Sequence, residues 1–254
     1  MDQAFEIIMV EFGLIGKKLS HSFSKEYFEG KFIFLNLTDH FYHLFELNEI
    51  SGLPELIQNH PALKGLNVTI PYKEDIIPLL NGLDDIAEKV AAVNVVKVEA
   101  DKTLSGFNTD FYGFKKSLLD WIAPGEQKAL VFGTGGAARA VCAVLEDLHV
   151  PYIRVSRKKR DDILTYADLK ADKSFLKDHK LIINATPLGM FPEVNTLPDI
   201  DYALVGPEHF LYDLVYNPDL TLFLKKGFGR GASIKNGFEM LHLQAEKSWE
   251  IWSA

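Results

Sequence analysis

The feature of this sequence that most restricts its fold is a glycine-rich turn at residues 130–141, which read LVFGTGGAARAV. An apolar run, the glycines and a helix-forming run follow one another there. This order is typical of a βα turn in which a strand leads into a helix whose N-terminus holds a pyrophosphate. Gly133, Gly135 and Ala138 have the spacing of a dinucleotide-binding loop. Turns of this kind also occur for packing alone, so the stretch by itself leaves both interpretations open.

Length and charge restrict what the chain can bind. With 254 residues it can form one large α/β domain or two modest ones. Its net charge of −8 argues against nucleic acid or an anionic membrane surface as the main partner, but leaves a small-molecule ligand possible, even an anionic one, because local charge decides that. The sequence has one cysteine, no basic leader in residues 1–10 and no apolar run of about 18 residues. We therefore expect a cytoplasmic protein without a membrane segment, monomeric or homodimeric.

Short strands and helices alternate along the chain, which predicts an α/β fold. In the first half we expect strands at 12–15, 41–47 and 65–69, helices at 24–30, 52–58 and 84–89, and a hairpin at 91–98 and 103–107. A further helix is expected to begin at Pro71. From about 110 to 233 the alternation is regular and predicts a Rossmann-type, doubly wound parallel sheet.

Two domains with a cleft between them follow from this pattern. The dinucleotide-binding domain is predicted to comprise residues 110–234, and the other domain residues 1–109 and 235–254. Residues 234–252 are predicted to form a long helix with an apolar face. Because this helix follows a complete nucleotide domain, we expect it to pack back on the first half.

The end of the strand after the glycine turn indicates which dinucleotide is bound. An acidic residue there bonds the ribose 2′-hydroxyl of NAD, whereas a basic residue accepts the 2′-phosphate of NADP. Residues 155–160 read VSRKKR, with no carboxylate before Asp161. Arginine can hold a phosphate with two hydrogen bonds, so NADP is favoured over an ordinary solvated basic loop. The candidate cofactor-binding residues are Gly133, Thr134, Gly135, Gly136, Ala137, Ser156, Arg157 and Lys158.

Polar residues in the first half suggest chemistry, although each also has an ordinary explanation. Ser22 and Ser24 precede a predicted helix and can donate to a carboxylate, or serve as an N-cap. Lys73 falls in a predicted first helical turn, where the dipole disfavours its charge and so suits proton transfer, but most such lysines are simply exposed. Asn94 lies in a predicted buried strand and needs a partner, either a ligand or the backbone. Asp110 stands at a helix start, where acidic residues are common.

Taken together and in order, these residues resemble those of the shikimate dehydrogenase family. The resemblance extends from near residue 12 to near residue 245. The segments that carry it are HSFS (21–24), NVTIPYK (67–73), AVN (92–94), GFNTD (106–110), the turn at 133–139, NATPLGM (184–190), YDLVYNP (212–218), and NGFEML (236–241) with Gln244.

The resemblance implies an NADPH-dependent oxidoreductase that reversibly reduces 3-dehydroshikimate to shikimate, without a metal, in the route to chorismate and the aromatic amino acids. It assigns Lys73 and Asp110 as a catalytic pair at the reacting oxygen. It assigns the substrate carboxylate and ring hydroxyls to Ser22, Ser24, Thr69, Asn94, Tyr216 and Gln244. It adds Thr186, Gly237 and Met240 to the cofactor side, with core packing as the alternative for Met240. The first domain is accordingly expected to bind the substrate.

The sequence departs from the family pattern at several positions. Lys18 and Lys25 replace prolines that flank the HSFS segment, and Ala92 replaces a glycine. Ser156 replaces the asparagine before Arg157, which affects the contacts expected for the 2′-phosphate.

Three other functions compete with this one. A quinate/shikimate dehydrogenase that uses both NAD and NADP is the nearest, and the lack of an acidic residue at 156–160 argues against it. A redox-silent ligand-binding paralogue would not need both Lys73 and Asp110. An interaction module would need an exposed apolar or charged stripe, of which the sequence gives no sign.

Overall fold

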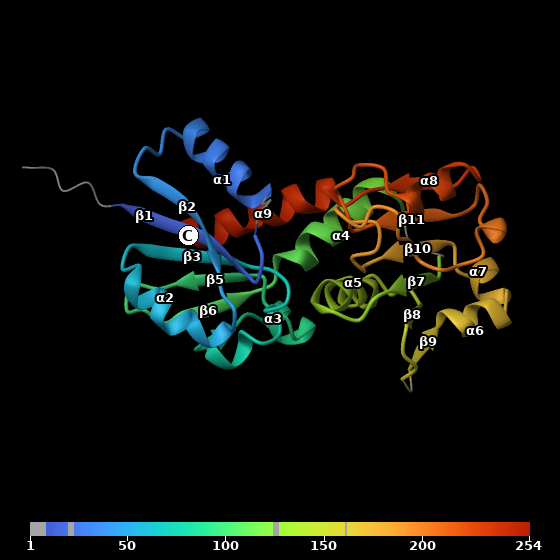
Figure 1. Cartoon of the computed structure of the whole chain (residues 1–254), viewed down its shortest axis with the longest axis horizontal. Helices are drawn as coiled ribbons and strands as arrows, with labels where there is room; N and C mark the ends of the chain where they lie inside the picture. Colours follow the sequence, from blue (N-terminus) through green and yellow to red (C-terminus); the bar gives the residue numbers. More distant parts are fainter. Residues whose placement is uncertain (1–8, 20–22, 124–126, 161) are drawn as a thin grey trace, which may run out of the picture. The chain divides into compact units, whose positions relative to one another are not determined.

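The computed structural model describes residues 9–19, 23–123, 127–160 and 162–254 (Figure 1). The chain forms two compact units: Met1–Thr109 with Ala245–Ala254, here unit 1, and Asp110–Gln244, here unit 2. All residues after 234 are predicted to belong to the first domain. In the structure residues 235–244 belong to unit 2, because β12 (Ser233–Lys235) pairs in its sheet with β11 (Phe210–Asp213). Helix α9 (Phe238–Ser253) therefore begins in unit 2 and ends in unit 1.

Unit 1 contains a mixed sheet with strand order β2-β1-β3-β5-β6-β4. β1 pairs in parallel with β2 and β3, whereas β5 runs antiparallel to β3 and to β6. The β5–β6 pairing is the predicted hairpin. The bounds are β1 (Val10–Gly16), β2 (His40–Glu46), β3 (Leu63–Val68), β4 (Gly82–Leu83), β5 (Val95–Val98) and β6 (Leu104–Phe107).

Helices cover both faces of this sheet and create two separate cores. On one face, aromatic residues of α1 (Phe23–Phe34) and the end of α9 surround Phe12, which stacks on Trp252 at 4.9 Å between ring centres. On the other face, Ile15 and Leu66 pack against Leu53 and Ala87. The elements there are η1 (Ile50–Gly52), α2 (Leu53–Asn59), η2 (Ile77–Leu79) and α3 (Asp85–Val90).

Two predicted helices of the first half differ from the structure. α1 does not end at Gly30 but continues to Phe34, because Phe28 and Phe32 on its buried face secure it against the sheet. The predicted helix at Pro71 is wrong: residues 70–76 form turns that lead into the short 3₁₀ helix η2. Lys73 is thus not in the first turn of an α-helix, and the dipole argument for it does not hold.

Unit 2 contains the predicted Rossmann sheet. Its six strands are all parallel and have the order β12-β11-β10-β7-β8-β9. Read from β7, this is the order of a doubly wound dinucleotide fold, with its switch point between β7 and β10. Ligands in such sheets bind beyond the carboxyl ends of the strands at that point. The remaining bounds are β7 (Ala129–Phe132), β8 (Tyr152–Ser156), β9 (Ile163–Thr165) and β10 (Leu181–Asn184).

Helices also cover the sheet of unit 2. Phe114 of α4 contacts Tyr212 of β11 edge-on, with ring centres 5.1 Å apart. Leu169, Leu176 and Phe223 join the core that includes Phe132. The bounds are α4 (Thr109–Trp121), α5 (Gly136–Asp147), α6 (Tyr166–Ala171), α7 (Ser174–Asp178), η3 (Tyr202–Leu204) and α8 (Leu222–Phe228).

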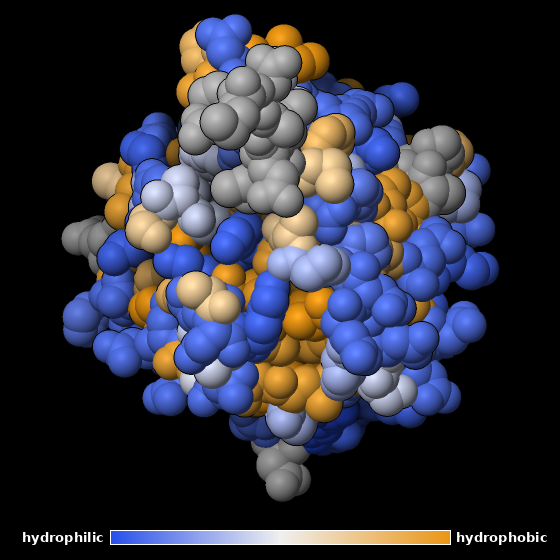
Figure 2. Space-filling view, turned by 90° about the vertical axis from the view of Figure 1, so that its left-hand side faces the viewer, coloured by the Kyte–Doolittle hydropathy of each residue, from blue (hydrophilic) through white to orange (hydrophobic). Residues whose placement is uncertain are grey.

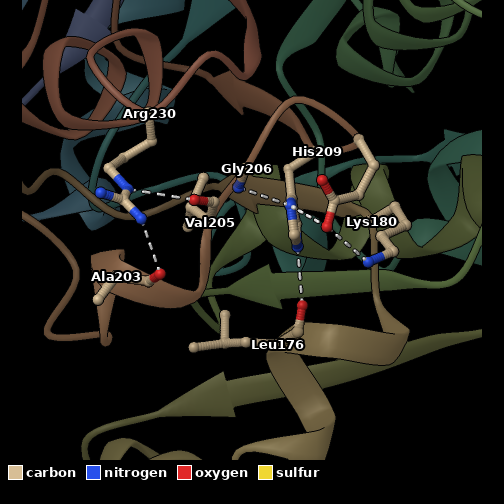
Figure 3. A network of polar contacts seen from close by, with 8 residues as sticks. Leu176, Lys180, Ala203, Val205, Gly206, His209 and Arg230 are labelled. Atoms are coloured by element: carbon tan, nitrogen blue, oxygen red, sulfur yellow. Dashed lines mark hydrogen bonds and ion pairs between the residues drawn. The ribbon is translucent and has the colours of Figure 1, made fainter.

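A buried histidine forms hydrogen bonds with neighbouring segments where β11 begins (Figure 3). His209 is fully buried; its Nδ1 accepts a 3.0 Å hydrogen bond from the Gly206 amide, and its Nε2 donates to the Leu176 carbonyl at 2.8 Å. Arg230 donates to the carbonyls of Val205 and Ala203 in the same region. Because β11 starts here, this network lies at the amino end of that strand, away from the ligand-binding edge, and its role is structural.

Hydrophilic residues cover most of the face drawn in Figure 2, with hydrophobic areas between them. Ile33 and Phe34, at the end of α1, are 78% and 82% exposed, so unit 1 presents apolar side chains to solvent there, which was not predicted. Within the described ranges, no helix is both long and apolar enough to cross a membrane.

Candidate functional site

Lys73 lies in a turn that is fixed at both ends by the sheet of unit 1. The turn follows β3, and the Thr69 amide donates to the Ile15 carbonyl at 2.9 Å where β1 and β3 end side by side. The Lys73 carbonyl accepts a 2.7 Å hydrogen bond from the Val93 amide, next to Asn94 in sequence. The backbone thus places Thr69, Lys73 and the segment before Asn94 in one region, at the carboxyl ends of these strands.

Asn94 is buried, as predicted, but it precedes β5 rather than lying within a strand. Its backbone bonds Phe107 and Val68 on either side. Its side chain binds Thr109: Oδ1 accepts from the Thr109 amide at 2.7 Å, and Nδ2 donates to Thr109 Oγ1 at 3.0 Å. The alternative of a backbone partner is therefore partly correct, since the Asn94 side chain receives the amide at the start of α4.

Of the two predicted carboxylate-binding serines, only Ser24 can be placed. It is the second residue of α1, half-buried and hydrogen-bonded to the Tyr42 hydroxyl. Ser22 lies outside the described residues.

Asp110 follows Thr109 in the first turn of α4 and is 6% exposed. It is the first residue of unit 2, whereas Lys73 belongs to unit 1. The pairing of Lys73 with Asp110 stays a prediction.

The glycine turn has the geometry expected of a cofactor loop. β7 ends at Phe132, and α5 begins at Gly136 with Gly135 as an N-cap that makes no side-chain hydrogen bond. Gly133 has a φ of +118°, and a Cβ there would lie 2.7 Å from the Ala185 carbonyl oxygen, so only glycine fits. A Cβ on Gly135 would meet nothing within 4 Å. The open side of the turn and the helix N-terminus fit a pyrophosphate.

The basic residues after β8 are exposed. Ser156 ends the strand, and its hydroxyl bonds both the amide and the carbonyl of Lys158, which shapes a tight turn around Arg157. The Arg157 and Lys158 side chains are exposed to solvent. This turn fits a 2′-phosphate, which cationic side chains can approach without a competing carboxylate in residues 156–160.

A buried polar cluster at the ends of β10 and β11 was not predicted as part of the site. Asn184 Oδ1 accepts from the amide and the hydroxyl of Thr186, at 3.1 and 2.6 Å. Asp213 accepts from Asn184 Nδ2 at 2.9 Å, from the Val215 amide at 3.0 Å and from the Thr221 hydroxyl at 2.6 Å. Burial outweighs these bonds and raises the pKa of Asp213 to about 7.

This cluster connects predicted site residues within unit 2. Through Asn184 it orients Thr186, and through Val215 it fixes the backbone next to Tyr216, which is half-buried. The sequence signal that could have indicated it is a polar residue at the end of each of two apolar strands, Asn184 in β10 and Asp213 in β11.

The predicted residues at the start of α9 also pack closely in unit 2. Gly237 precedes the helix, and a Cβ there would collide with the backbone of Leu214. A Cβ on Gly113 of α4 would lie 2.6 Å from the Met240 carbonyl and 3.2 Å from Gln244 Cβ, so the helices touch there. Met240 is 6% exposed, in keeping with the core-packing alternative.

Residues 14–96 match the model of the shikimate dehydrogenase substrate-binding domain. Over 95% of its length the chain is 39% identical to the NADP(+) shikimate dehydrogenase of Clostridium beijerinckii, of which it covers 91%. It is 36% identical to a chorismate mutase/shikimate 5-dehydrogenase fusion protein from Clostridium acetobutylicum, with a TM-score of 0.83 and coverage of 96% and 91%.

A third similar protein is shikimate 5-dehydrogenase from Listeria monocytogenes, whose crystal structure contains shikimate and NAD. It is 27% identical, with a TM-score of 0.83 and coverage of 96% of this chain and 92% of the other. Because the Clostridium beijerinckii enzyme is 39% identical to this chain and matches it over 95% of its length, the chain belongs to the shikimate dehydrogenase family.

Proposed function

We propose that this protein is an NADP-dependent shikimate dehydrogenase that interconverts 3-dehydroshikimate and shikimate. The observation that carries the proposal is the match over 95% of the chain to a relative of that name, together with the ordered segments that carry the family resemblance. Unit 1 is the substrate-binding domain and unit 2 the NADP-binding domain. The protein acts in the cytoplasm, as a monomer or homodimer.

NADPH supplies a hydride to the ring ketone carbon. As the carbonyl becomes a hydroxyl, negative charge develops on its oxygen, and a positioned donor is most valuable there. The Lys73 ammonium donates a hydrogen bond and then a proton to this oxygen. The Asp110 carboxylate orients the ammonium and the hydroxyl, and in the reverse direction the same pair removes the proton.

Binding of the substrate falls to neutral hydrogen-bonding groups. Ser22 and Ser24 hold the carboxylate, and Thr69, Asn94, Tyr216 and Gln244 bond the carboxylate or the ring hydroxyls. Buried donors and acceptors of this kind discriminate strongly, because an analogue that lacks a hydroxyl leaves them unpaired.

In unit 2, Thr134, Gly136 and Ala137 offer backbone amides to the pyrophosphate while Gly133 and Gly135 let it approach. Ser156, Arg157 and Lys158 hold the 2′-phosphate. Thr186, Gly237 and Met240 surround the nicotinamide end.

One kinetic experiment separates this function from its alternatives. Initial rates of nucleotide reduction are measured with shikimate and with quinate, each with NADP and with NAD. We expect efficient turnover only with shikimate and NADP. Equal efficiency with NAD would favour the dual-cofactor quinate/shikimate enzyme. Absence of turnover, with shikimate still binding, would favour a redox-silent paralogue.

A further inference from the structure

In the interior of unit 1, hydrogen bonds connect polar side chains into one continuous series. Its two ends are residues with a proposed role in substrate binding, whereas the members between them have none. In order, the series consists of Ser24, Tyr42, Asn67, Ser248, Thr109 and Asn94.

The first part of this hydrogen-bonded series connects α1 to β3. The Tyr42 hydroxyl is bonded to Ser24 and donates to Asn67 Oδ1 at 2.7 Å. Tyr42 is 2% exposed, and burial raises the pKa of its hydroxyl well above the ordinary value. The hydroxyl therefore stays protonated at neutral pH and remains a donor to Asn67.

The second part connects β3 to the start of α4 through the last helix. Asn67 Nδ2 donates to Ser248 Oγ at 3.2 Å, and Ser248 Oγ lies 3.4 Å from Thr109 Oγ1. Ser248 is fully buried, and Thr109 is 1% exposed. Ser248 lies in Ala245–Ala254, the end of α9 that belongs to unit 1, so this hydrogen bond depends on the packing of that helix end within unit 1.

Thr109 determines which way the Asn94 amide faces. A backbone N–H can only donate, so the atom of Asn94 that faces the Thr109 amide at 2.7 Å must be the oxygen. The amide nitrogen then faces Thr109 Oγ1, which Ser248 also contacts. A rotation of the Thr109 side chain would remove one of the two bonds that fix Asn94.

We propose that Tyr42, Asn67 and Ser248 are positioning residues, which hold the Ser24 hydroxyl and the Asn94 amide in the orientation that binds the substrate. The proposal rests on the substrate-binding roles given above to Ser24 and Asn94. Apolar side chains could fill the same interior without the free-energy cost that a buried polar group incurs when it lacks a partner. Six polar side chains in one connected series are thus explained better by orientation than by packing.

The test uses the full-length enzyme and the variants Tyr42→Phe and Ser248→Ala, each of which removes one hydroxyl with little change in shape. We expect the KM for shikimate to rise about tenfold in each, and the KM for NADP to stay within about twofold of the wild type. Because both variants release the same Asn67 amide, the double variant should lose less than the product of the single losses. Ser248→Thr, which keeps the hydroxyl, should recover most of the affinity.

Unit 2 offers a matched control pair. Tyr212 and Ser117 are fully buried and hydrogen-bonded to each other at 2.8 Å. Tyr212→Phe and Ser117→Ala should lower the melting temperature about as much as the test variants and leave the KM for shikimate unchanged.

Asn94→Ala distinguishes a failure of the positioning role from a failure of the substrate-binding role proposed for Asn94. If it raises the KM for shikimate while Tyr42→Phe and Ser248→Ala lower only the melting temperature, the positioning role is wrong and the site stands. If Asn94→Ala itself leaves this KM unchanged, the assignment of Asn94 is wrong, and the positioning role is overturned with it.

Discussion

Asn184 donates a 2.9 Å hydrogen bond to Asp213, and this bond joins the carboxyl ends of two neighbouring strands, β10 and β11. Both side chains are fully buried. At one end the link reaches Thr186, which is proposed to bind the cofactor, and at the other it reaches the backbone beside Tyr216, which is proposed to bind the substrate.

Stability should therefore depend on the protonation of Asp213. Its folded pKa of about 7 lies above the ordinary 3.8, so between these values the folded protein holds a proton that the unfolded chain has released. Stability from this group should fall as pH rises from about 4 to about 7, by on the order of 4 kcal/mol, and level off above. Urea unfolding across this range should show a flatter profile for Asp213→Asn. An unchanged profile would contradict the assignment.

Lys73→Ala should lower kcat for shikimate oxidation by about two to four orders of magnitude, the range for a positioned acid–base group. Lys89→Ala, an exposed lysine in the last turn of α3, serves as the control and should leave kcat unchanged. Near-normal turnover of Lys73→Ala would remove it from the catalytic pair.

Arg157→Ala should raise the KM for NADP about 10- to 100-fold, as expected for loss of a charged hydrogen bond to phosphate, with little effect on the poor rate with NAD. Arg154 of β8 is the matched control, because its side chain pairs with Asp162. Equal effects of Arg157→Ala on both nucleotides would show that it does not read the 2′-phosphate.

Gly65→Ala should destabilise the protein by about 1–3 kcal/mol, because the new methyl group would collide with the Trp252 indole, which donates to the Val96 carbonyl at 3.0 Å. Gly30→Ala makes the same chemical change on the exposed side of α1, where nothing lies within 4 Å. It should stabilise by about 0.5–1 kcal/mol through helix propensity. Urea unfolding of both variants checks the opposite signs.

His209→Ala should cost about 2–4 kcal/mol, since it removes two hydrogen bonds and leaves a cavity at the start of β11 (Figure 3). Lys180→Ala breaks only the partly exposed pair with Glu208 in the same network and should change stability by less than about 1 kcal/mol. Thermal melting compares the two, and KM values should be unaffected in both.

The sequence predicted correctly those structural elements that depend mainly on neighbouring residues. The glycine turn at 133–136, the regular alternation of unit 2 and the β5–β6 hairpin each depend on nearby residues, and each appears in the structure. The prediction was wrong at Gly30 and Pro71. At Gly30 the packing of Phe28 and Phe32 outweighed a helix-breaking residue. After Pro71 the chain forms turns with short-range backbone hydrogen bonds, such as that from the Tyr72 amide to the Thr69 carbonyl, while the Val93 amide of another segment donates to the Lys73 carbonyl.

The sequence by itself determined the family, the type of sheet in unit 2 and the residue types available for the reaction, because these follow from ordered motifs and hydrophobic periodicity. Only the tertiary structure decided which polar groups meet inside each unit. Asn67 and Ser248 are 181 residues apart in sequence, and Ser117 and Tyr212 are 95 apart. No local pattern encodes such pairs, since a buried amide needs a partner without specifying which one, and the packing of the helices on the sheets selects it.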